Sequence, residues 1–294
     1  MKNINLRVII FLISCLFILN SCSSLYYYPI KEELIDRTRL PVQPNDIYFN
    51  SQNGKKLHGW YFNHRNENPE KPNRTKAIIV HFHGNAQNIS THFMQLYFVL
   101  DYDYDYFIFD YQGYGESEGS PNPEKTVQDG LAALNWVQNN NPKLPIIVVG
   151  QSLGGIIALK TIIEFQKISQ NSKEFLIPNI TIDSSFINYK SVSQDTVSKS
   201  WLTWWLQPIA WLIMDNSMSP EKELSSLKNT RFIIIHGTKD RVVDYKFGEE
   251  LYVKLPEPKI FVKLDGGQHT DYFWRDKGVN QKKWIEMIDA TLNN

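Results

Sequence analysis

The sequence has little cysteine and no excess of charge of either sign. Its 294 residues include two cysteines, too few for a disulfide framework. The 31 basic residues balance the 31 acidic ones, which excludes a strongly basic nucleic-acid-binding protein and an acidic disordered tail. What the chain does have is apolar material. Hydrophobic residues make up 42% of it, which is enough for one large globular core.

The N-terminal segment is typical of a secretory signal. A basic start with Lys2 and Arg7 precedes an apolar run at 8–19, which is shorter than the ~20 residues of a membrane-spanning helix. Leu19-Asn20-Ser21-Cys22 resembles the lipobox of bacterial lipoproteins, and this resemblance implies cleavage before Cys22 and acylation of its thiol. A second such site ending at Cys15 would halve the apolar run. An uncleaved anchor and a plain secretory signal are the alternatives.

These features predict a signal peptide at 1–21 and a tether at 22–45. The protein would then lie in the bacterial cell envelope, anchored by lipid on the extracytoplasmic side. Ser23 after Cys22 resembles an outer-membrane sorting signal.

Apolar strands alternate with helices through the rest of the chain. Asn53-Gly54 predicts a hairpin turn within 46–63, because glycine readily adopts positive φ. This alternation indicates an α/β fold with a mostly parallel sheet and helices on both faces, in which ligands bind at the carboxyl ends of the strands. Further strands are predicted at 76–82, 106–109, 145–149, 179–182, 231–235 and 259–263. Helices are predicted at 123–138, 152–165 and 274–292, and the segment 90–100 is amphipathic.

A candidate nucleophile lies between a predicted strand and a predicted helix. Gly150-Gln151-Ser152-Leu153-Gly154 is a G-x-S-x-G motif in the strand–turn–helix context that a nucleophile elbow requires. We expect Ser152 to be the nucleophile and the Leu153 N–H to be one oxyanion donor. The alternative is an ordinary glycine-rich turn with an N-capping serine.

The serine needs a base, and seven histidines are candidates. His269 follows the last predicted strand, so it can reach the elbow. His81 and His83 lie on one face of a strand end and could suggest a metal pair, but no third ligand has a recognisable spacing. We therefore predict no metal and no cofactor. We expect structural hydrogen bonds at His236, and surface or hairpin positions for His58, His64 and His92.

The acid that orients the histidine is expected to be Asp240, just past a strand end. Asp183 also ends a strand and is the rival. Asp244 is better explained as the start of a helix. Asp110 and Asp271 are expected to be structural or surface groups.

A second oxyanion donor is expected from the loop after the strand that ends near Phe82. Gly84 lets the backbone approach a substrate closely, and the N–H of Asn85 is our candidate donor. The alternative is that Gly84 only forms the turn.

Together these motifs resemble the α/β-hydrolase superfamily over residues 46–294, and within it the depalmitoylase-like and serine-aminopeptidase-like small hydrolases. The segments that carry the resemblance are His83-Gly84-Asn85-Ala86, Phe109-Asp110-Tyr111-Gln112-Gly113-Tyr114-Gly115-Glu116-Ser117, the Ser152 elbow, the Asp240 loop and the His269 loop. The chain order serine, aspartate, histidine matches that superfamily. The resemblance implies an eight-stranded fold and the three catalytic roles, but no particular substrate.

A lid insertion is expected at about 184–220. It holds four of the eight tryptophans, Trp201, Trp204, Trp205 and Trp211. Tryptophan favours lipid–water interfaces and apolar pockets, so the segment is interpreted as an acyl-chain pocket or a membrane-touching lid. The other interpretation is a buried helical pair that packs on the core.

The resulting hypothesis is a serine hydrolase that cleaves an acyl ester or thioester through an acyl-enzyme, with a lipid-like substrate such as a palmitoyl group. Its partners would be this substrate and the membrane, and not nucleic acid. The alternatives are amide or peptide cleavage, and a non-catalytic lipoprotein scaffold with the same fold.

Overall fold

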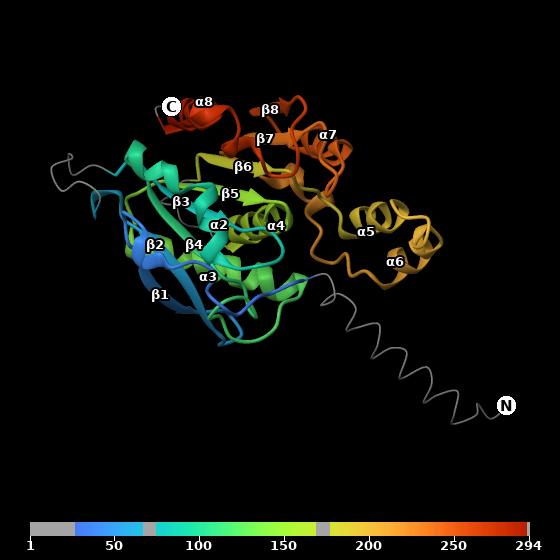
Figure 1. Cartoon of the computed structure of the whole chain (residues 1–294), viewed down its shortest axis with the longest axis horizontal. Coiled ribbons are helices and arrows are strands. Elements are labelled where there is room, and N and C mark those ends of the chain that lie inside the picture. Colours follow the sequence, from blue (N-terminus) through green and yellow to red (C-terminus); the bar gives the residue numbers. More distant parts are fainter. Residues whose placement is uncertain (1–26, 67–74, 169–176, 293–294) are drawn as a thin grey trace, which may run out of the picture.

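The computed structural model describes residues 27–66, 75–168 and 177–292, so the predicted signal peptide and Cys22 lie outside the described residues. The strands form one eight-stranded sheet in the order β1-β2-β4-β3-β5-β6-β7-β8 (Figure 1). β1 and β2 are antiparallel and every pairing from β4 to β8 is parallel, which confirms the predicted sheet. The strands are β1 Asn45–Asn50, β2 Lys56–Phe62, β3 Ile78–Phe82, β4 Asp105–Phe109, β5 Ile146–Gln151, β6 Asn179–Asp183, β7 Arg231–Gly237 and β8 Lys259–Leu264.

The hairpin between β1 and β2 closes at the predicted turn, where Gly54 has a φ of +78°. The amphipathic segment at 90–100 lies in a short α-helix followed by two 3₁₀ helices. The α-helices are α2 Ile89–His92, α3 Pro123–Asn140, α4 Leu153–Ile168, α5 Tyr189–Ser198, α6 Gln207–Ile213, α7 Tyr245–Lys254 and α8 Val279–Leu292. None of the described helices is both long and apolar enough to span a membrane.

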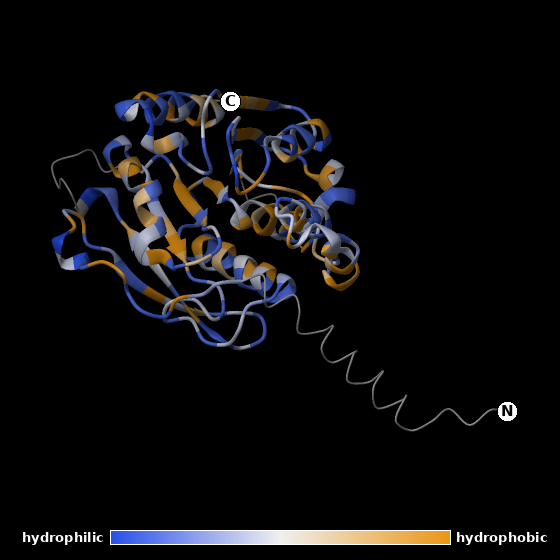
Figure 2. Cartoon of the chain, turned by 45° about the vertical axis from the view of Figure 1, so that its right-hand side comes forward, coloured by the Kyte–Doolittle hydropathy of each residue, from blue (hydrophilic) through white to orange (hydrophobic). Residues whose placement is uncertain are grey.

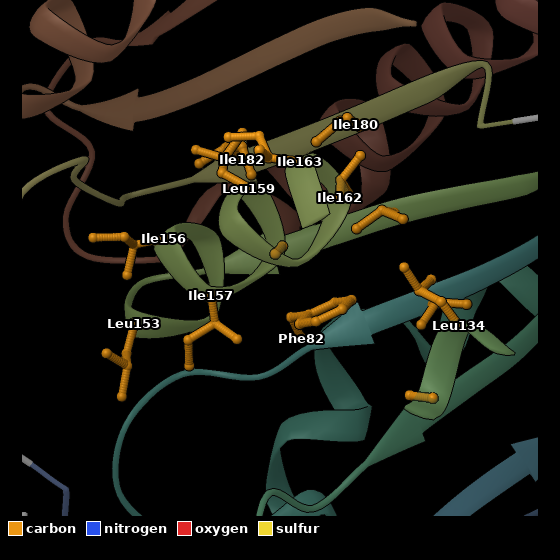
Figure 3. Close-up of a cluster of buried hydrophobic side chains, with 14 of the residues drawn as sticks. Phe82, Leu134, Leu153, Ile156, Ile157, Leu159, Ile162, Ile163, Ile180 and Ile182 are labelled. Atoms are coloured by element: carbon orange, nitrogen blue, oxygen red, sulfur yellow. The ribbon is translucent and has the colours of Figure 1, made fainter. Parts of the chain in front are cut away.

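The central strands carry apolar side chains on both faces, and alternate residues feed two separate cores. Ile78, Val80 and Phe82 of β3 pack on one face with α3, α4 and α7 (Figure 3). Ile79 packs on the other face with α8 and the 3₁₀ segments after α2. This period of two is the geometry of a strand covered on both sides. Because β3, β5, β6, β7 and β8 pair in parallel, the carboxyl ends of β3, β5, β7 and β8 lie along one edge of the sheet.

Residues 27–44 differ from the expected tether, because they pack against the domain. The Tyr27 side chain is buried beside Thr126, and Val42 is buried in the second core. Pro29 pairs with Gln87, and Lys31 donates a hydrogen bond to the carbonyl of Ser117. We call residues 27–34 the strap. The apolar side chains and backbone partners of this segment make it part of the folded unit.

The expected lid is present as a separate helical layer between β6 and β7. It consists of α5, the 3₁₀ helix Trp204–Leu206 and α6, which pack on one another and extend away from the sheet (Figure 1). Its four tryptophans are exposed, so the interpretation of a buried helical pair is wrong.

Candidate active site

Ser152 occupies a strained turn between β5 and α4. Its φ is +53°, a conformation that non-glycine residues adopt rarely and that is often found at functional sites. A Cβ on Gly154 would overlap the carbonyl oxygen of Phe82, and one on Gly150 would lie 2.7 Å from the Cα of Gly155. The two glycines of the motif therefore let the turn pack tightly enough to present the serine above the sheet.

Neighbouring elements hold the backbone of Ser152 in place. Its N–H donates to the carbonyl of Asp183 at 2.9 Å, and its own carbonyl accepts from the Ser185 hydroxyl at 2.6 Å. These bonds connect the elbow to the end of β6. They offset part of the cost of the positive φ.

The side chains of Ser152, Asp240 and His269 lie together although they are far apart in the sequence. His269 Nε2 lies 2.9 Å from Ser152 Oγ, and His269 Nδ1 lies 2.8 Å from Asp240 Oδ2. An ionised carboxylate can only accept, so Nδ1 donates to Asp240 and Nε2 of the neutral ring accepts from the serine hydroxyl. This is the hydrogen-bond chain by which a base can take the serine proton.

Asp240 is held as a carboxylate inside the protein. Its side chain has no exposed surface, and Oδ1 accepts the backbone N–H groups of Val242 and Val243 at 2.8 and 2.9 Å. Burial works against ionisation, but the hydrogen bond from His269 and the two backbone donors bring the pKa of Asp240 below its ordinary value. A buried, charged acceptor suits a group that must stabilise a histidine cation.

The rival Asp183 serves a different set of partners. Gln151 Nε2 donates to its Oδ2 at 3.0 Å and the Ser184 hydroxyl donates to its Oδ1 at 2.9 Å. The same hydroxyl accepts the N–H of Thr270, next to His269. Asp183 thus supports the loop that carries the histidine. Asp244 caps the start of α7, as expected.

The loop after β3 lies against the elbow. A Cβ on Gly84 would lie 3.5 Å from the Ser152 Cβ. Asn85 Oδ1 accepts from three groups, the N–H of Ala86, the hydroxyl of Tyr114 and the N–H of Tyr28 in the strap, at 2.9 to 3.0 Å. Leu153 is the first residue of α4, where backbone N–H groups have no acceptor within the helix. The two predicted oxyanion residues therefore flank Ser152. Sequence patterns did not indicate the strap's part in holding Asn85.

Comparisons with known proteins agree with this architecture. A family model described as serine aminopeptidase, S33, matches residues 73–206, which include Asn85 and Ser152. Over 98% of this chain and 96% of the relative, the sequence is 28% identical to uncharacterized protein YfhR of Salmonella typhimurium. It is also 27% identical to the lysophosphatidylserine lipase ABHD12 of Danio rerio, over 60% of this chain and 46% of that protein.

Among solved structures, esterase Pf2001 of Pyrococcus furiosus superposes with a TM-score of 0.64 at 19% identity. The match covers 90% of this chain and 98% of the esterase. A likeness at this identity establishes a shared fold. The protein has the α/β-hydrolase fold. The resemblance inferred from the motifs is confirmed at this level.

Most of the remaining histidines lie deeper in the fold than the sequence suggested. His58 and His64 are buried beside Asp46 and Asp105. The side chain of His92 stacks on His83 and bonds the carbonyl of Ala86. His236 bonds the carbonyl of Val243, as a structural histidine would. His58 thus lies in the predicted hairpin, although it is buried there. The expected surface positions are wrong for His64, which is buried, and for His92, which is half-buried, because neighbouring segments pack over them.

His81 and His83, the residues that could suggest a metal pair, both form hydrogen bonds with groups of the protein. His81 bonds the Tyr106 hydroxyl at 2.7 Å and Gln151 Oε1 at 3.0 Å. His83 Nδ1 bonds the carbonyl of Gly84. Within the described parts of the chain, no cluster of three or more histidine, cysteine or acidic side chains could hold a metal ion. Both histidines thus act in the packing beneath the elbow and the Gly84 loop.

Asp110 is buried below the Gly84 loop of the hydrolase. Its Oδ1 accepts the N–H of Ile89 at 3.0 Å and lies 3.6 Å from His83 Nε2. Burial raises the pKa of Asp110 to about 8, against 3.8 for the unperturbed group. The carboxyl is therefore protonated in the folded protein and ionised in the unfolded chain between these two pH values.

We expect Asp110→Asn to flatten the pH dependence of stability. A raised folded-state pKa gives stability that is full below about pH 4 and is lost as pH rises to about 8. Between pH 5 and pH 8 the wild-type free energy of unfolding should therefore fall by up to about 4 kcal/mol through this group. The amide can still accept from Ile89 but does not ionise, so the variant should lack this loss in urea denaturation.

Asp129→Asn is the matched control, because burial raises the pKa of Asp129 to only about 6. Its effect should be confined to the lower part of the pH range. An Asp110→Asn curve parallel to that of wild type from pH 5 to pH 8 would contradict the prediction.

Proposed function

We propose that this α/β-hydrolase is a serine hydrolase that cleaves acyl esters or thioesters through an acyl-enzyme intermediate. The proposal depends on one observation, the continuous hydrogen-bond chain from Ser152 Oγ through His269 to Asp240. The strained elbow at Ser152 and the buried carboxylate of Asp240 support it. Each lowers the stability of the fold, and such features are often found at functional sites.

The proposed reaction uses groups that are already in place. His269 Nε2 takes the Ser152 proton as Oγ attacks the acyl carbonyl carbon. The backbone N–H groups of Asn85 and Leu153 stabilise the oxyanion, and Asp240 stabilises the imidazolium. His269 then protonates the leaving oxygen or sulfur. In the second half, His269 deprotonates a water that attacks the acyl carbon and releases Ser152.

Substrates with an apolar acyl part are favoured, because the chain leads from the end of β6, which bonds Ser152, into the apolar lid segment. The similarity to a lysophosphatidylserine lipase supports this class, since that relative is named for a lipid ester. The serine aminopeptidase description of the matching family model supports amide cleavage as a second candidate.

An acyl-length series tests the proposal and separates these candidates. Purified protein should hydrolyse p-nitrophenyl esters, with kcat/KM rising from the acetyl to the medium-chain esters. It should act much more slowly on p-nitroanilides of the same acyl groups. Faster cleavage of aminoacyl p-nitroanilides would favour the aminopeptidase-like function. Turnover of neither class would favour a non-catalytic scaffold.

We also propose that a diacylglycerol group on Cys22 attaches the protein to the membrane. The protein would then lie on the extracytoplasmic side of the cell envelope. The lipobox-like residues 19–22 support it. Two acyl chains give stable anchoring, whereas one chain gives marginal binding.

A further inference from the structure

The lid exposes an apolar surface that the rest of the described chain does not cover. We call this surface the lid face. Its seven side chains are between 47% and 80% exposed, and α6 has no buried residue. Scattered exposed apolar residues are common, but a cluster of this kind on one element usually marks an interaction site. The lid face consists of Trp201, Leu202, Trp204, Trp205, Ile209, Trp211 and Leu212.

The lid is attached to the domain through the other sides of its helices. Tyr189, Val192 and Ser193 of α5 are buried, and α6 packs on α5. The apolar ring of Trp211 is covered in part by Lys190, whose ammonium lies 4.1 Å from the ring centre. The stretch 199–214 contains Lys199 and no carboxylate. An aromatic, acid-free surface with nearby lysines suits the headgroup region of a lipid bilayer.

The start of the described chain shows which side of the molecule faces the predicted anchor. Tyr27 is fixed against Thr126, and Tyr28 against Asn85 beside the elbow. Cys22 precedes Tyr27 by five residues, a separation of at most about 18 Å in an extended chain. Figures 1 and 2 both show the described chain beginning on the side of the domain that carries α5 and α6. An acyl group on Cys22 would therefore bring this side to the membrane.

We propose that the lid face docks on the lipid bilayer, with its tryptophan rings at the level of the headgroups. The lipid anchor and the lid would then be two points of attachment to the same membrane. The proposal rests on the proposed anchor at Cys22 for the side of the molecule that faces the bilayer, and not on the proposed hydrolysis.

Quenching by brominated lipids tests the proposal on the full-length protein. The protein is reconstituted into vesicles of phosphatidylcholine and phosphatidylglycerol that carry bromine on their acyl chains. Bromine quenches only tryptophans in contact with the bilayer. We expect partial quenching in wild type, and loss of most of it when all four lid tryptophans are replaced by phenylalanine, which preserves the apolar surface.

Trp274→Phe is the matched control, since Trp274 is 57% exposed but lies outside the lid. It should keep the quenched intensity of wild type, so that the quenched fraction stays the same or rises slightly. Blue-shifted emission from buried Trp60 and Trp284 reports that each variant is folded. An unchanged quenched fraction in the four-residue variant would overturn the proposal.

Two further outcomes would also overturn it, because each assigns the lid face to another occupant. Lid quenching that a soluble short-chain ester relieves would assign it to the acyl part of the substrate. The lid face would instead belong to a second copy of the chain if three results came together. The lid tryptophans would be unquenched, the wild-type protein would sediment as a dimer, and the Trp201→Ser, Trp205→Ser double variant would sediment as a monomer.

Discussion

Replacing Ser152 with alanine is expected to abolish ester hydrolysis and covalent labelling by a fluorophosphonate probe. The probe reacts with an activated serine, and Ser152 Oγ is the hydroxyl within hydrogen-bond distance of His269 Nε2. Without it no acyl-enzyme forms, so kcat should fall by about 10⁵-fold or more, as in other triad enzymes. Steady-state turnover of a p-nitrophenyl ester and in-gel fluorescence measure the two effects.

Ser193→Ala is the matched control for this experiment. Ser193 is also a buried serine, but its hydroxyl bonds the carbonyl of Tyr189 in α5. Labelling should persist in this variant. If Ser152→Ala still reacts with the probe, another residue is the nucleophile. If wild type does not react at all, the scaffold hypothesis gains support.

Replacing Asp240 with asparagine is expected to lower kcat by about 10³- to 10⁴-fold while leaving the fold intact. The amide can keep the backbone bonds from Val242 and Val243, so the loop should hold its shape. It carries no charge to stabilise the imidazolium. Its N–H₂ group can also turn toward His269 Nδ1 and favour the wrong tautomer. The readouts are the pH profile of kcat and thermal unfolding of the same sample.

Asp183→Asn removes the same charge from a neighbouring strand end and serves as the comparison. Asp183 bonds Gln151 and Ser184, whereas Nδ1 of the histidine ring bonds Asp240. This variant should lose stability more than kcat, because its amide N–H₂ group would face the donor of Gln151. A loss of kcat in Asp183→Asn that equals the loss in Asp240→Asn would make Asp183 the catalytic acid.

Local patterns were sufficient for the order of the elements and for the candidate triad. The alternating runs of 76–82 and 145–149 carry a strand signal that does not depend on distant residues. The G-x-S-x-G motif carries its own steric explanation, since Gly150 and Gly154 are needed wherever that turn forms. Strand ends share one edge in a parallel sheet, which is why residues at 152, 240 and 269 could be expected to meet.

The sequence favoured Asp240 over Asp183, but it could not show which partners each acid contacts. Asp183 and Asp240 both follow parallel strands, and only the three-dimensional arrangement directs one to His269 and the other to Gln151 and Ser184. The burial of His58 and His64 was equally hidden, because it depends on residues that are distant in the sequence, such as Asp105 beside His64.

The sequence by itself determined the α/β order of elements, the tight turn at Ser152 and the spacing of the strand-end residues, because each follows from side-chain periodicity and backbone sterics over a few neighbouring residues. Only the tertiary structure decided that residues 27–34 hold the Asn85 loop and that the lid tryptophans face outward. Both depend on which surfaces are already covered by other parts of the chain, and that is a property of the whole fold.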